Sequence, residues 1–219
     1  YRRRLWRMLV SLRLLIAPPG RRAGISADER SADREHLRLA WLVALGTVPA
    51  VIAGLFFKDF FERFFYSPHL VSIFLLVTGA LLFCSRLAVR VDERRLLWWA
   101  ALLIGVAQAA AIFPGISRSG ATIAAGLLLG LKPGEAAEFS FLLALPAILG
   151  AGLLEFLGLP GGGTSAAAAE MAALLPGFAA ALVSGYLAIV LLLKVLLAGR
   201  FDRFAYYCWS VGIAGLVLL

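Results

Sequence analysis

The sequence predicts an all-α, polytopic integral membrane protein. Hydrophobic residues make up 62% of the 219-residue chain, and its mean hydropathy is +0.91. Soluble domains are nearer half apolar. Uncharged apolar stretches long enough to cross a bilayer recur along the chain, which is the pattern of membrane-spanning helices. The alternating short strands of a transmembrane barrel are not evident in the sequence.

Positive charge is concentrated in the first part of the chain. The net charge is +8, and residues 1–38 hold 10 of the 21 Lys and Arg residues. In a membrane protein such a cluster indicates a cytoplasmic segment rather than a nucleic-acid site. We therefore predict a basic cytoplasmic segment over residues 1–38, with a polar loop at 17–38, and a membrane domain over residues 39–219. Nucleic acid is not an expected partner.

Five spans are expected in the membrane domain, at residues 39–57, 70–87, 139–157, 171–193 and 204–219. Residues 58–69 form an aromatic linker with balanced charge, as is typical of a membrane interface. Residues 158–170 contain no Lys or Arg. By the positive-inside rule, the basic loops at 86–95 and 194–203 are cytoplasmic together with residues 1–38, and the other two linkers lie outside.

The segment 96–131 must begin and end on the cytoplasmic side for this topology to hold. Pro114 and Gly115 interrupt it and leave limbs of about 18 and about 12 residues. At ~1.5 Å per residue the second limb is too short for a ~30 Å hydrocarbon core. We therefore predict a re-entrant helical hairpin. Its turn must face a cavity, because non-helical backbone at that depth is tolerated only inside protein or beside water.

Arg118 is the only charged residue between Leu96 and Leu131. A lone arginine at membrane depth costs roughly 2.5–3.5 kcal/mol or more, which makes it a functional candidate. A helix over about residues 120–131, capped by Ser117 or Ser119, would offer free N–H groups to an anion. The planar guanidinium group can hold two phosphate oxygens at once.

Small residues around the arginine strengthen this interpretation. Ser117, Ser119 and Thr122 add hydroxyl donors, and Gly115 and Gly120 allow a close approach of the backbone. The combination predicts a site for phosphate or diphosphate.

Structural roles remain open for several of these residues. Pairing with carbonyl groups or with an acidic residue of another helix also explains Arg118, and helix packing also explains the hydroxyl residues. Gln108, on the first limb, either bonds to the turn or joins helices. Glu138, expected in the first turn of the next helix, is explained by the helix dipole or as a catalytic group.

Several stretches resemble a known family. Residues 105–108 (GVAQ) and 113–123 (FPGISRSGATI) are similar to the second signature of the undecaprenyl-diphosphate phosphatase (bacitracin-resistance) family. The resemblance extends to residues 46–50 (GTVPA), 135–146 (EAAEFSFLLALP) and 184–187 (SGYL). It covers the chain from the first basic loop onward.

The resemblance implies a multi-pass enzyme of the bacterial inner (plasma) membrane. Such an enzyme removes one phosphate from undecaprenyl diphosphate and returns the carrier to peptidoglycan synthesis. The resemblance further implies two inverted repeats whose re-entrant hairpins meet in one site, and a divalent cation such as Mg²⁺ or Ca²⁺. Arg118 and Ser117 match substrate-phosphate and catalytic positions, and Thr122 matches a further site position. Bacitracin would compete for the lipid substrate, membrane lipids are partners, and a homodimer is one open arrangement.

The family's first signature is an acidic helix followed by a Pro-Val-Ser-Ser-Thr-Gly-His run, and it belongs before Tyr1. We therefore expect the metal ligands in a missing N-terminal part, and no metal site in this chain. A chain holding half of the active site is expected to be inactive alone. Broken helices and an intramembrane anion site are transporter traits as well. A polyprenyl-phosphate flippase or anion transporter is thus the main alternative, and a non-catalytic membrane scaffold is the second.

Overall fold

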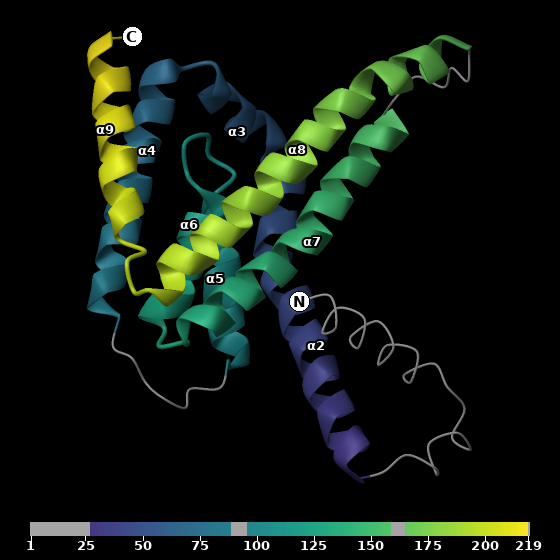
Figure 1. Cartoon of the computed structure of the whole chain (residues 1–219), viewed down its shortest axis with the longest axis vertical. Coiled ribbons are helices and arrows are strands. Elements are labelled where there is room, and N and C mark those ends of the chain that lie inside the picture. The colour runs from purple at the N-terminus through teal and green to yellow at the C-terminus, as the bar shows by residue number, and fades with distance from the viewer. Residues whose placement is uncertain (1–26, 89–95, 159–164, 219) are drawn as a thin grey trace.

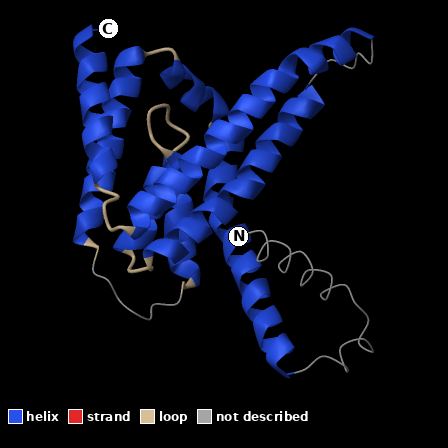
Figure 2. Ribbon diagram, in the orientation of Figure 1, coloured by secondary structure: helices blue, strands red, loops and turns tan. Residues whose placement is uncertain are grey.

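Helices make up nearly all of the described structure. The computed structural model describes residues 27–88, 96–158 and 165–218. Figure 2 shows helices and loops over these residues and no strand. In chain order the elements are α2 (Ala27–Phe56), α3 (Lys58–Phe65), α4 (Pro68–Cys84), the 3-10 turn η2 (Ser85–Leu87), α5 (Trp98–Ala110), α6 (Arg118–Leu128), α7 (Pro133–Gly158), α8 (Ser165–Leu197) and α9 (Arg203–Leu218). The all-α prediction is confirmed.

The predicted spans correspond to long apolar helices. Four helical stretches are long and apolar enough to cross a membrane: Arg34–Phe56, Pro68–Leu87, Pro133–Leu153 and Leu174–Leu197. They match the first four predicted spans. The fifth, at 204–219, is α9, an apolar helix of 16 residues. The protein is therefore a polytopic helical membrane protein.

Two segments predicted as loops contain long helical stretches, and α8 also extends into the predicted loops 158–170 and 194–203. α2 begins at Ala27, inside the predicted loop 17–38, because the sequence there is rich in the strong helix formers Ala, Glu and Arg. The predicted linker 58–69 contains α3, which buries Phe61 and exposes Glu62. This separation of apolar and charged faces stabilises a short surface helix. Residues 1–26 of the predicted basic segment lie outside the described residues.

The helices surround the hairpin formed by α5 and α6 (Figure 1). α4 and α9 lie side by side, α2 packs along α5, and α7 and α8 run together away from α4 and α9. α6 contacts α4, α5 and α7. The fully buried side chains follow this arrangement and include Ile104 of α5, Ile123 of α6 and Leu143 of α7. The hairpin is thus the element on which the core is built.

Glycines allow two of the helix pairs to approach closely. A Cβ on Gly105 of α5 would overlap the carbonyl oxygen of Gly46 in α2, and a Cβ on Gly79 of α4 would overlap the Trp209 ring of α9. The Trp209 ring nitrogen also donates to the carbonyl oxygen of Leu76 at 3.2 Å. Small residues at such crossings are expected where lipid gives helices no hydrophobic reason to associate. The crossings fix α5 and α4, both of which contact α6.

Segments predicted to be cytoplasmic lie beside one another. The Arg38 guanidinium group donates to the carbonyl oxygen of Leu96 at 2.7 Å. Arg38 ends the predicted N-terminal segment, and Leu96 begins the segment predicted as a hairpin. Arg86 Nε lies 3.2 Å from Asp202 Oδ2 and so joins the loops predicted at 86–95 and 194–203. In Figure 1, α3 lies toward the opposite end of α4 from this ion pair. This grouping agrees with the predicted topology.

Cysteine labelling tests which face of the membrane each end occupies. We expect Tyr66→Cys, after α3, to react with an impermeant maleimide added to intact cells. Arg200→Cys, before α9, should react only after permeabilisation. Both positions are exposed, and the native Cys84 and Cys208 are replaced by alanine in each variant. Labelling of both positions from the same face would contradict the topology.

Candidate active site

The re-entrant segment folds as two short helices joined by a turn. α5 has 13 residues and α6 has 11, so at ~1.5 Å per residue neither crosses a ~30 Å hydrocarbon core. The limbs are shorter than the sequence predicted because residues 111–117 are not helical. The two short helices pack against each other as a helical hairpin, and its re-entry into the membrane stays a prediction. The inverted-repeat architecture implied by the family resemblance stays a prediction.

The chain reverses at Pro114 and Gly115, as the sequence predicted. The Ile116 amide donates to the carbonyl oxygen of Phe113 at 3.1 Å, and Gly115 has a φ of +97°. Proline followed by a glycine of positive φ matches a type II turn. A Cβ on Gly115 would also overlap the carbonyl oxygen of Val71 in α4. Both conformation and space therefore require glycine here.

Aromatic packing holds the start of the turn. The Phe113 ring meets four other rings at centroid distances of 4.8 to 6.2 Å. These rings belong to Phe60, Phe61 and Phe64 of α3 and to Phe74 of α4. The helix α3 thus packs against the hairpin turn and fixes the position of Phe113, where the turn begins.

Ser117 caps α6. Its Oγ accepts a hydrogen bond from the Gly120 amide at 3.1 Å, and its carbonyl oxygen accepts one from the Ala121 amide at 2.8 Å. Of the two predicted caps, Ser117 is therefore the one used, and the helix begins at Arg118 rather than near residue 120. A Cβ on Gly120 would lie 3.0 Å from Ser117 Oγ, so the absence of a side chain there leaves room for the cap.

Arg118 and Ser119 present unpartnered donors at the start of α6. In the described part of the chain, neither backbone amide has a hydrogen-bond acceptor, and neither the guanidinium group nor the Ser119 hydroxyl has a partner. The predicted structural role for Arg118, pairing with a carbonyl or carboxylate group, has no counterpart among these residues. An unpaired guanidinium beside free amides at a helix N-terminus is suited to bind an anion.

Thr122 lies one turn further along α6 and is 1% exposed. Its hydroxyl donates to the carbonyl oxygen of Arg118 at 2.8 Å and is hydrogen-bonded to the Ser140 hydroxyl of α7. These bonds fix the first turn of α6 against α7. The geometry therefore gives Thr122 a positioning role, while direct contact with a ligand stays a prediction.

Thr78 of α4 is a site residue that the sequence analysis missed. Its Oγ1 donates to the carbonyl oxygen of Gly115 at 2.9 Å and accepts from the Ser117 amide at 3.1 Å. The sequence did contain a clue, since Thr78 is a hydroxyl residue in the middle of an apolar span. Only the packing of α4 against the turn gives that hydroxyl its role.

Gln108 and Glu138 are placed differently by the fold. Gln108, in the last turn of α5, is 3% exposed, and neither amide atom has a partner in the described structure. It therefore joins no helices there, and its amide stays available for a hydrogen bond near the turn. Glu138 lies in the second turn of α7, and Glu135 occupies the first turn where Glu138 was predicted.

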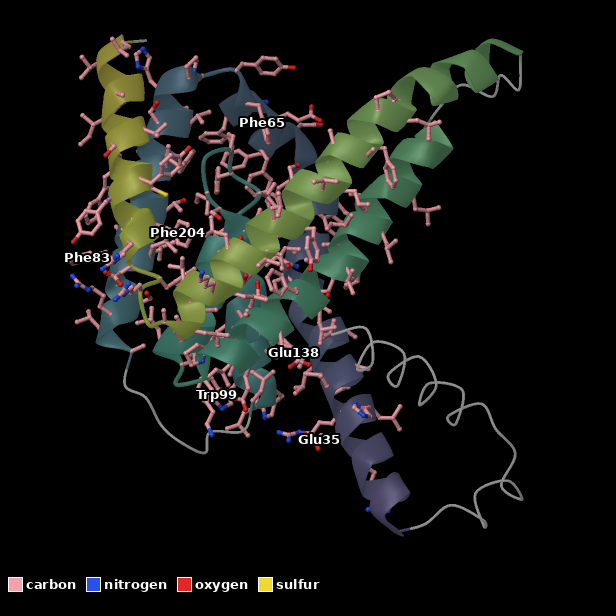
Figure 3. The ribbon with its side chains drawn as sticks, in the orientation of Figure 1. Glu35, Phe65, Phe83, Trp99, Glu138 and Phe204 are labelled. Atoms are coloured by element: carbon pink, nitrogen blue, oxygen red, sulfur yellow. The ribbon has the colours of Figure 1, made fainter. Side chains whose placement is uncertain are left out.

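Glu138 also lies away from the turn. Residues two apart on a helix point about 200° apart, so Glu138 does not share the face of α7 on which Ser140 meets Thr122. Figure 3 shows Glu138 where α7 passes α2, toward the opposite end of the hairpin from its turn. Of the two predicted supporting residues, only Gln108 lies at the turn end of the hairpin.

The turn does not fit a divalent cation. Among the residues whose side chains the structure describes (34–57, 59–88, 96–153 and 174–218), no three His, Cys, Asp or Glu form a group that could hold a metal ion. The donors at the turn are a guanidinium group, two amides and hydroxyls, and these suit an anion.

The fold and the turn define a helical membrane protein whose hairpin presents unpartnered hydrogen-bond donors suited to an anion. The family described as bacitracin resistance protein BacA matches residues 1–214, and the chain belongs to this family. Its relatives include an undecaprenyl-diphosphatase of Methanothermobacter thermautotrophicus, 52% identical over 177 residues, or 78% of this chain and 96% of that protein. An undecaprenyl-diphosphatase of Methanosphaera stadtmanae is 42% identical over 198 residues, or 89% and 70% of the two chains. One of Carboxydothermus hydrogenoformans is 41% identical over 183 residues, or 83% and 70%.

Substitution of Gly115 tests the geometry of the turn. We expect Gly115→Ala to displace the turn from α4 and to lower the free energy of unfolding in detergent by about 1–3 kcal/mol, through strain and overlap. Gly54→Ala in α2 is the matched control, because a Cβ there meets nothing within 4 Å. Thermal unfolding measures both variants, and equal melting temperatures would contradict the turn geometry.

Proposed function

We propose that this protein hydrolyses undecaprenyl diphosphate to undecaprenyl phosphate and inorganic phosphate. Water is added, and one bond between phosphorus and the bridging oxygen of the diphosphate breaks. The terminal phosphate is released as inorganic phosphate, and the lipid keeps one phosphate. The main support is the unpaired guanidinium group of Arg118 at the N-terminus of a helix inside an apolar hairpin. The family and the names of its relatives supply the substrate class.

The described residues would act mainly by positioning and electrostatics, which dominate phosphoryl transfer. Arg118 would hold two oxygens of the terminal phosphate in its planar fork. The free amides of Arg118 and Ser119 would face the same group at the helix end. Gly120 at position N3 has no side chain, which leaves room for the Ser117 cap beside these amides.

Ser117 is proposed as the hydroxyl that meets the reacting phosphate. The Gly120 N–H that donates to its Oγ would also stabilise negative charge on that oxygen. Thr122 is proposed to act through Arg118, whose carbonyl oxygen it holds. The Gln108 amide, unpartnered in the described structure, is proposed to support the bound head group directly or through a water molecule.

The membrane setting suits a substrate with a long lipid tail. The apolar chain would stay among the helices while the head group reaches the turn. We further propose that the protein acts in the bacterial inner membrane, where it returns the carrier to peptidoglycan synthesis. Bacitracin would compete for the same lipid. A homodimer, and a divalent cation held by groups outside the hairpin turn, complete the proposal.

Replacement of Arg118 tests the proposal directly. We expect Arg118→Ala to lower phosphate release from undecaprenyl diphosphate by about 10²–10³-fold, the usual effect of losing one preorganised donor. Arg118→Lys should recover only part of the rate, because an ammonium group cannot form the planar fork. Release is measured in detergent micelles with Mg²⁺ on the full-length protein, because this chain alone is expected to be inactive, and binding of the lipid is measured in parallel.

Arg200→Ala is the matched control, since Arg200 is exposed and lies between α8 and α9. Equal phosphate release by the wild type and Arg118→Ala would show that Arg118 has no role in the reaction. If the wild type releases no phosphate but binds the lipid tightly through Arg118, the flippase alternative is favoured.

Metal removal tests the cofactor. A divalent cation contributes several kcal/mol of charge stabilisation in such reactions, so EDTA should lower the release rate by at least ~100-fold. Mg²⁺ or Ca²⁺ added back in excess should restore it. A rate that EDTA leaves unchanged would contradict the cation requirement without affecting the role of Arg118.

A further inference from the structure

Thr78 connects a neighbouring helix to the backbone that carries the proposed phosphate-binding residues. The side chain is 1% exposed. Its single hydroxyl group donates to the carbonyl oxygen of Gly115 at 2.9 Å and accepts from the amide of Ser117 at 3.1 Å. The two bonds bracket Ile116, so one side chain fixes the position of three consecutive turn residues.

Both bonded backbone groups lie where no helix can satisfy them. Gly115 and Ser117 precede α6 and follow α5, and such groups cost free energy when they are buried without a partner. The Ser117 amide lies immediately before the free amides of Arg118 and Ser119. A shift of Ser117 therefore moves the cap of α6 and every donor that faces the ligand.

The bonds of Thr78 differ from the usual behaviour of buried helical threonines in this protein. Thr47 donates to the carbonyl oxygen of Val43 four residues earlier, and Thr122 donates to that of Arg118. Such back-bonding within the helix is the common local solution for a buried hydroxyl. Thr78 shows no bond of this kind and is bonded to the turn, 37 and 39 residues away in sequence.

The helix that carries Thr78 is itself held in place. Its neighbour Gly79 packs against the Trp209 ring, and that ring donates to the carbonyl oxygen of Leu76. Arg86 of η2, the turn that directly follows α4, pairs with Asp202 before α9. α4 is thus fixed to α9 on both sides of Thr78, so the hydroxyl is a rigid reference point for the turn.

We infer that Thr78 is a positioning residue for the reaction: it holds Ser117 and Arg118 where a bound phosphate meets both. The inference rests on the proposed function for its catalytic meaning. The structural part of the inference is that the Thr78 hydroxyl holds the turn against α4. That part does not depend on the proposed function.

The test compares Thr78→Val, which keeps the shape and removes both bonds, with Thr78→Ser, which keeps the hydroxyl. Thr47→Val is the matched control, because it removes a buried hydroxyl whose bond stays within α2. We expect Thr78→Val to lower kcat for phosphate release by about tenfold to a hundredfold, since small misplacements of catalytic groups cost that much. KM should change little, Thr78→Ser should recover most of the rate, and Thr47→Val should keep the wild-type rate.

Hydrogen–deuterium exchange gives a second readout that needs no activity. The amides of residues 113–120 should exchange faster in Thr78→Val than in the wild type, and those of Thr47→Val should not. If Thr78→Val does not fold, Thr78→Cys takes its place, since a thiol is only a weak donor.

The outcomes separate this inference from the proposed function. A wild type without phosphatase activity would contradict the proposed function. Faster exchange confined to Thr78→Val would still support the positioning of the turn by Thr78. Exchange in residues 113–120 that is unchanged in Thr78→Val overturns the inference whatever the activity. The inference is also overturned if the wild type is active and Thr78→Val has the same kcat.

Discussion

The structure depends on one constraint: a stretch of non-helical backbone must be accommodated deep in an apolar protein. Each residue there carries polar groups that lipid cannot satisfy. The type II turn at Pro114 and Gly115 pairs one carbonyl with one amide, the Ser117 side chain satisfies the Gly120 amide, and Thr78 satisfies two further groups. Among the described residues, the amides of Gly115, Arg118 and Ser119 then remain, together with the unpaired guanidinium group of Arg118. The site consists of the donors that the fold leaves unused.

The surrounding helices can be understood as supports for that turn. α3 provides three of the four rings that pack on Phe113, and α4 provides the fourth together with Thr78. α7 holds the first turn of α6 through Ser140 and Thr122. Each support comes from a different part of the chain, so the turn is positioned by tertiary packing. Local sequence preference alone does not fix it.

The difference between local chemistry and tertiary packing explains which features the sequence could predict. The hairpin, its break at Pro114 and Gly115, and the anion-binding character of Arg118 follow from local chemistry: proline and glycine interrupt helices, and a lone charge is costly at membrane depth. The break and the cap follow from rules that act over a few positions, and the role of Arg118 in binding an anion stays a prediction. The Ser117 cap was one of two alternatives, because both serines satisfy the capping rule.

The remaining features depend on contacts between distant segments. Thr78 and Ser140 have no local pattern that distinguishes them from packing residues, and only the approach of α4 and α7 reveals their roles. Glu138 was placed in the wrong helical turn because the start of α7 at Pro133 was set a few residues too late. Helix boundaries are the least reliable part of such reasoning.

Charge balance links the turn to the rest of the proposed site. Arg118 supplies one full positive charge, and a helix N-terminus adds roughly half a charge. A terminal phosphate alone carries about −1.5 to −2 at pH 7, and a diphosphate has a second charged group. The turn by itself therefore leaves a diphosphate under-neutralised in a low-dielectric setting, where unbalanced charge is costly. Further positive charge must reach the head group from outside the turn, which is the physical reason why a cation requirement and an Arg118 requirement belong to the same proposal.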